Sequence, residues 1–231
     1  MNDQPGFPDM AGAILYLWLA VVYVAYIARG ALPSDKAPAR RRPATVLADR
    51  IIFFLAFFAL PVLGFALAGY EIPGLPILST GKPGTWGLPV TFLCCAAACL
   101  GLFSKKSPAD IANYPQYSPP AWTPKAIILE IVSWSLYLFA YEFAFRGMIL
   151  HGLLPAGYWT AIAIQTALYA FAHLPKSGKE AAGAIVFGVL TSVMTLAWGT
   201  VYPAFLVHLA LALGNDMGCT RAFRNREKIR N

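Results

Sequence analysis

The chain has 231 residues, of which 58% are hydrophobic and only 13% are charged. Soluble globular domains carry about 25% charged residues, so this composition excludes an ordinary water-soluble domain. The net charge of +7 does not indicate a nucleic-acid partner, because basic residues beside apolar blocks usually meet anionic lipid headgroups. We therefore expect membrane lipids as partners and no nucleic acid.

Seven apolar blocks of roughly 14–24 residues follow one another along the chain, and a helix needs about 20 residues to cross ~30 Å of hydrocarbon. The expected fold class is all-α, a polytopic membrane protein with about seven transmembrane helices. The predicted spans are Ala11–Ala28, Ile51–Gly69, Leu88–Phe103, Ala126–Ile149, Tyr158–His173, Ala181–Trp198 and Tyr202–Asn215.

The basic residues predict how the spans are oriented. No Lys or Arg precedes the first span, which argues against a cleaved secretion signal and for an anchor with its N-terminus outside. The segments then predicted to lie inside hold six, three, two and five of the 18 Lys and Arg residues; they are Arg29–Arg50, Ser104–Lys125, Leu174–Glu180 and Asp216–Asn231. This asymmetry follows the positive-inside rule. It predicts a cytoplasmic C-terminus and, in a bacterial host, the inner membrane.

Ionisable residues inside the spans are the candidates for function, because each costs at least about 2.5 kcal/mol at the centre of a membrane helix. The candidates are Glu130, Glu142, Arg146, His173 and His208, with His151 nearer a span end. No lysine falls within any span, which argues against a retinal Schiff base.

Glu142 and Arg146 are four residues apart, so on a helix they share one face. Taken alone, they are equally consistent with a self-neutralising pair that only lowers the cost of insertion. His173 ends the fifth span below Gln165 and Tyr169, which form a polar stripe with it. Polar side chains facing lipid would stay unsatisfied, so this stripe is expected to face the bundle interior.

The last span carries His208, whose imidazole needs a partner from another helix. Together, Glu142, Arg146, His173 and His208 place an acid, a guanidinium and two imidazoles on three spans. A buried carboxylate with two imidazoles supplies the proton acceptor and the oxyanion stabilisation that hydrolysis needs. One Glu with two His is also a zinc ligand set. No HExxH pattern is present, so a divalent metal is possible but not favoured, and no other cofactor is expected.

Three short motifs carry a resemblance to a known family. The segments YEFAFRG (Tyr141–Gly147), YAFAH (Tyr169–His173) and FLVHLALALGN (Phe205–Asn215) resemble the EExxxR, FxxxH and HxxxN/D motifs of the CAAX protease and bacteriocin-processing family of membrane endopeptidases. The resemblance implies a cavity among helices in which a glutamate-activated water attacks a peptide bond. The implied substrate is a peptide or protein cleaved near a lipidated or hydrophobic C-terminus, or within a leader peptide.

The site residues implied by the resemblance are Glu142, Arg146, His173 and His208. The chain departs from the family pattern at three positions. Tyr141 stands where the family has its first Glu, Tyr169 replaces a Phe, and Ala212 replaces an Asn or Asp. A phenol, with a pKa of about 10, is a poor base at neutral pH. Either Glu142 takes over the base role, or the chain binds its ligand without cleaving it.

The expected organisation has three parts. Residues 1–125 form an accessory region with three transmembrane helices, residues 126–216 a four-helix protease-like core, and residues 217–231 a basic cytoplasmic tail. An intramembrane endopeptidase, a hydrolase, is the leading interpretation. The alternatives are a catalytically lapsed relative that acts as a binding, scaffold or immunity protein, and a small transporter, although no similarity between the two halves indicates the repeats of a transporter.

Overall fold

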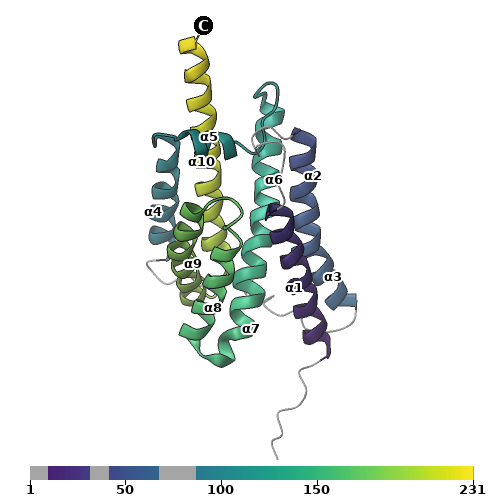
Figure 1. Ribbon diagram of the computed structural model, residues 1–231. Coiled ribbons are helices and arrows are strands. Elements are labelled where there is room, and N and C mark those ends of the chain that lie inside the picture. Colours follow the sequence, from purple (N-terminus) through teal and green to yellow (C-terminus); the bar gives the residue numbers. More distant parts are fainter. Residues whose placement is uncertain (1–9, 32–41, 68–86, 231) are drawn as a thin grey trace, which may run out of the picture.

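The computed structural model describes residues 10–31, 42–67 and 87–230 (Figure 1). No strand occurs among these residues, so the all-α prediction is confirmed. The elements are α1 (Met10–Ala31), α2 (Pro43–Phe54), η2 (Leu55–Ala59), α3 (Leu60–Leu67), α4 (Gly87–Cys99), η4 (Leu100–Leu102), α5 (Pro108–Asn113), α6 (Pro124–Glu142), η5 (Phe143–Leu150), α7 (His151–Leu153), η6 (Leu154–Ala156), α8 (Tyr158–Phe171), α9 (Gly178–Trp198) and α10 (Tyr202–Arg230).

The predicted spans coincide with helices in the described part of the chain except at Phe103, Ala172 and His173, which lie in turns just after η4 and α8. Residues 68 and 69 of the second span lie outside the described part. Three continuous helices are long and apolar enough to cross a membrane, and they are Pro43–Leu67, Pro124–Ala156 and Gly178–Trp198. Shorter apolar helices cover Tyr16–Arg29 and Gly87–Leu102. The protein is therefore a helical membrane protein, while the number of seven crossings stays a prediction.

Two segments are more helical than the hydropathy pattern indicates. The loop predicted after the third span contains α5, whose first turn is closed by a capping box in which Ser107 Oγ accepts from the Asp110 N–H (3.1 Å) and Asp110 Oδ2 accepts from the Ser107 N–H (2.8 Å). The hydrogen bond from the Ser107 N–H holds the pKa of Asp110 below its usual value. The last helix also continues past the predicted span end at Asn215 to Arg230. Both extensions are polar, and hydropathy does not detect polar helices.

Helices α6 and α10 form the centre of the bundle (Figure 1). α6 packs against α2 on one side, α10 packs against α4 on the other, and α8 pairs with α9. The contact of α10 with η4 depends on Gly218, because a Cβ there would lie 2.8 Å from the Gly101 carbonyl oxygen. Small residues at such crossings allow two membrane helices to approach closely.

A buried ionic network ties α2 to this centre. Arg50 donates to Glu130 Oε2 (2.7 Å) and to Ser133 Oγ (2.8 Å), and its guanidinium lies 3.9 Å from the centre of the Trp134 ring. The Trp134 indole N–H in turn donates to Asp216 Oδ2 (2.9 Å). Glu130 therefore has a structural partner, the arginine that directly precedes the second predicted span.

Candidate active site

The acid–arginine pair lies at a change in helix type. Glu142 is the last residue of α6, and Arg146 lies in η5, a π-helical segment with i→i+5 hydrogen bonds. Both side chains are fully buried (0% exposed). Arg146 Nη1 lies 3.1 Å from Glu142 Oε2 without hydrogen-bond geometry, whereas Arg146 Nη2 donates to Thr191 Oγ1 at 2.5 Å. The guanidinium also stacks over the Tyr169 ring at 4.1 Å. One cation thus neutralises the buried carboxylate.

Glu142 also contacts the last helix. Its Oε1 lies 2.5 Å from His208 Nδ1 on α10. An ionised carboxylate only accepts hydrogen bonds, so Nδ1 carries the proton and the lone pair of the neutral ring is on Nε2. The Tyr169 hydroxyl lies 3.4 Å from the same Nδ1. The two carboxylate oxygens therefore hold two different groups, and Glu142 orients His208 as the acid of a catalytic triad orients its histidine.

The second histidine is oriented by the backbone. His173 Nδ1 lies 2.8 Å from the Tyr169 carbonyl oxygen, which can only accept, so Nδ1 carries the proton and the ring presents its lone pair on Nε2. Its ring centroid lies 4.8 Å from that of Tyr169. Among the described residues, no hydrogen bond or ion pair joins His173 to Glu142 or His208.

Tyr141 stands between the two imidazoles. Its ring centroid lies 6.2 Å from His173 and 5.9 Å from His208, and both rings meet it nearly edge-on. The side chain is 2% exposed, and its hydroxyl has no hydrogen-bond partner among the described residues. Where the family motif has a carboxylate, this chain thus has an aromatic spacer with an unpaired hydroxyl.

The predicted polar stripe faces inward. Gln165 is fully buried, and its Oε1 accepts from Ser192 Oγ at 2.6 Å. Sequence reasoning missed Ser192 and its neighbour Thr191, the partners that α9 contributes, because neither is ionisable. The signal was present as hydroxyl residues within the apolar run GVLTSVMTLAW, where Thr191, Ser192 and Thr195 all prove to be fully buried.

Two polar residues of the motif regions lie outside this cluster. Asn215, which follows the third motif, accepts from Lys106 Nζ at 2.8 Å and does not contact His208. His151 directs its Nδ1 to the Arg146 carbonyl oxygen at 2.9 Å. Of the three histidines in the chain, two therefore face Tyr141 and the third stays outside.

The donor atoms of the cluster are bonded to other protein groups. Glu142 Oε1 and His208 Nδ1 bond directly to each other, and His173 Nδ1 is occupied by a carbonyl. No group of three or more His, Cys, Asp or Glu side chains suited to a metal ion occurs in the part of the chain that the structure describes. The arrangement is suited to proton transfer, because each imidazole presents the lone pair of its Nε2 and the buried Glu142 carboxylate orients His208.

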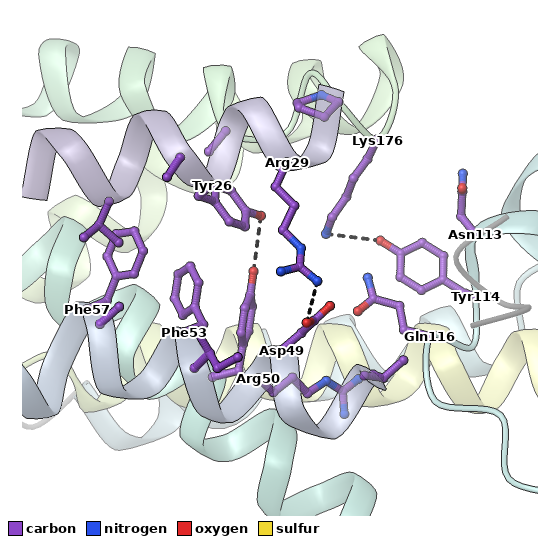
Figure 2. Close-up of a pocket in the computed structure, with 18 residues that line it drawn as sticks. Tyr26, Arg29, Asp49, Arg50, Phe53, Phe57, Asn113, Tyr114, Gln116 and Lys176 are labelled. Carbon is purple, nitrogen blue, oxygen red and sulfur yellow. Dashed lines mark hydrogen bonds and ion pairs between the residues drawn. The ribbon is translucent and has the colours of Figure 1, made fainter. Parts of the chain in front are cut away.

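A cavity of about 360 Å³ lies on the other side of Tyr141, between α1 and α2 (Figure 2). Tyr26, Phe53 and Tyr137 line it, and their rings are centred 6.5, 5.8 and 6.1 Å from that of Tyr141. The Glu142, Arg146, His173 and His208 side chains do not line it. Aromatic rings therefore lie between this side of the cavity and Tyr141, whereas Ala172 and Lys176, close to His173 in the sequence, form another part of its wall.

Comparison with known proteins identifies the segment that carries this cluster. Residues 121–213 match the model of a family described as type II CAAX prenyl endopeptidase Rce1-like. The matched segment contains all four predicted site residues, and the resemblance predicted from the motifs is confirmed. Neither a curated protein nor a solved structure matches the chain.

Proposed function

Because residues 121–213 are similar to the Rce1-like type II CAAX prenyl endopeptidases, we propose that the protein is an intramembrane endopeptidase. Its substrate is a peptide or protein with a lipidated C-terminus or a hydrophobic leader, cleaved near the membrane surface. The observation that carries the proposal is the Glu142–His208 contact of 2.5 Å, which joins two helices of the matched segment through a buried carboxylate and an imidazole.

In the proposed mechanism His208 is the general base. Its Nε2 takes a proton from water while the water oxygen attacks the peptide carbonyl carbon, and Glu142 stabilises the imidazolium that forms. His208 then returns the proton to the peptide nitrogen, the C–N bond breaks, and a carboxylate and an amine leave. This assignment replaces direct water activation by Glu142, because its Oε1 bonds His208 and its Oε2 lies 3.1 Å from Arg146 Nη1.

His173 and Arg146 support the same step. The Nε2 of His173 accepts a second hydrogen bond from the attacking water and so orients it. Arg146 stabilises the ionised form of Glu142, whose side chain is fully buried. The reaction as proposed uses side chains and water alone. The core of residues 126–216 would carry it, in the cytoplasmic membrane with the C-terminus inside.

The test is hydrolysis of two peptide classes by purified protein, a prenylated C-terminal peptide and a hydrophobic leader peptide. Wild type is compared with His208→Ala and His173→Ala, and with His151→Ala as the matched control outside the cluster. We expect wild type and the control to cleave at least one class, and the two site variants to lose activity by about 10²–10⁴-fold, the range for general acid–base groups. Binding of both classes by wild type without cleavage would establish instead a catalytically lapsed binding protein.

A further inference from the structure

The helical segments that flank the cavity, α1 on one side and α2 with η2 on the other, are joined by two polar contacts. Near one end the Trp18 indole N–H donates to the Ala56 carbonyl oxygen (2.9 Å), and at the other Arg29 pairs with Asp49 (2.6 Å). The outer face of α1 is apolar and exposed, with Leu17 at 67% and Val24 at 64%. In a membrane, the cavity therefore lies at the edge of the bundle, next to lipid.

Its walls differ strongly from end to end (Figure 2). One end is apolar, with the side chains of Val22, Ala25, Phe53, Ala56 and Phe57. The other is polar and carries two cations, Arg29 and Lys176, that keep unused N–H donors, with the side chains of Arg29, Asp49, Asn113, Tyr114, Gln116 and Lys176. Arg50 also lines the cavity, but Glu130 and Ser133 already bond its guanidinium. Such a cavity suits an amphiphile with one charged end.

The polar end lies at the level expected for lipid headgroups. It is built from the end of α1, the beginning of α2, the segment after α5 and the turn before α9, all of which the basic residues place on the inner side. From Arg29 to Val22 the helix rises by about 10 Å, so the apolar end reaches well into one leaflet of a ~30 Å hydrocarbon core.

The cavity is distinct from the proposed catalytic cluster. Most of its lining comes from α1, α2 and η2, outside the segment 121–213 that carries the family resemblance. The rings of Tyr26, Phe53 and Tyr137, which line it, pack against Tyr141, while Ala172 and Lys176 bring another part of its wall close to His173 in the sequence. Because most of the lining lies outside the matched segment, we favour a lipid over a substrate peptide as the occupant.

We propose that this cavity binds an anionic phospholipid, with its phosphate between Arg29 and Lys176 and one acyl chain between α1 and α2. A guanidinium has five N–H donors and an ammonium three. Arg29 uses Nη2 for Asp49, and Lys176 has Tyr114 Oη at 3.5 Å and Glu180 Oε2 at 3.9 Å. Donors therefore remain for phosphate oxygens, and basic pockets between membrane helices on the cytoplasmic side are known to bind such headgroups.

The experiment measures binding of phosphatidylglycerol and phosphatidylcholine to the purified full-length protein, by native mass spectrometry and by the shift in unfolding temperature. Wild type is expected to bind phosphatidylglycerol more tightly. In the double variant Arg29→Gln/Lys176→Gln its affinity should fall about thirtyfold, as expected for the loss of two basic residues near an anionic lipid. The control Lys125→Gln removes one charge from the same side, at an exposed residue outside the cavity, and should keep the preference.

A second variant tests the apolar end without touching a charge. Ala25→Phe fills the wall between the helices and should weaken binding of both lipids. Equal binding of the two lipids by wild type would overturn the proposal, as would an unchanged preference in the double variant. If phosphatidylglycerol does not bind and a hydrophobic peptide with a free carboxylate does, the cavity is a substrate site instead. No arm requires peptidase activity, so the result is independent of the proposed function.

Discussion

Replacing Glu142 with Gln keeps the size of the side chain and removes its charge. Arg146, 0% exposed, would lose its ion-pair partner and keep the hydrogen bond to Thr191. Removing one member of a buried ion pair costs about 3–5 kcal/mol. For a chain of this length a loss of 3 kcal/mol lowers the unfolding temperature by about 6–12 °C.

The same change alters the protonation of His208. The side-chain amide introduced by Glu142→Gln can donate to Nδ1, which favours the tautomer with the proton on Nε2 and removes the basic lone pair. Such an exchange of carboxylate for amide beside a catalytic histidine lowers kcat on the order of 10⁴-fold. We therefore expect hydrolysis to fall far more than the loss of folded protein explains.

Peptide hydrolysis and thermal unfolding, measured on the same detergent preparation, separate the two effects. The double variant Glu142→Gln/Arg146→Met removes the orphaned cation as well, and replacement of a buried pair by apolar groups is often neutral. It should recover most of the unfolding temperature and stay inactive. If the double variant instead cleaves peptide at a rate within about tenfold of wild type, roughly 1.4 kcal/mol in the activation barrier, Glu142 is needed only for folding. The proposed catalytic pairing of Glu142 with His208 would then be refuted.

Three further changes test other parts of the structure. Tyr141→Phe removes a buried hydroxyl without a partner among the described residues, so the free energy of unfolding should stay level or rise by about 1 kcal/mol. The rate of hydrolysis should stay within about threefold of wild type. A large loss of kcat at unchanged stability would place this hydroxyl in the reaction. Gly218→Ala should destabilise by about 1–3 kcal/mol in thermal unfolding because its Cβ would meet the Gly101 carbonyl at 2.8 Å, whereas Gly183→Ala, with nothing within 4 Å, should stabilise by about 0.5–1 kcal/mol. Asp110 has a lowered pKa, so the stabilisation from its ionised carboxylate is complete above about pH 5 and is lost as the pH falls through ~4 and below. The difference in unfolding temperature between wild type and Asp110→Asn should therefore narrow at acid pH. A difference that widens would contradict the capping role of Asp110.

Sequence reasoning located the helices because apolar length is a direct physical requirement of the bilayer. The same signal could not detect α5 or the end of α10 after Asn215. Those segments are polar, and one is stabilised by the Ser107–Asp110 capping box.

The candidate site was predictable in membership but not in pairing. The free-energy cost of placing an ionisable side chain in an apolar span is enough to single out Glu142, Arg146, His173 and His208. That Glu142 bonds His208 while His173 bonds a carbonyl depends on how α6, α8 and α10 pack together. Thr191 was missed because a hydroxyl in a membrane helix can satisfy itself on its own backbone, as Thr191 also does on the Phe187 carbonyl (2.7 Å).

The most direct measurement of the proposed function is peptide hydrolysis in water enriched in ¹⁸O, analysed by mass spectrometry. If His208 activates water, wild-type protein releases a fragment whose new C-terminal carboxylate carries one ¹⁸O atom, and His208→Ala yields none above background. Intact peptides of both classes after prolonged incubation with folded wild-type protein would contradict the account.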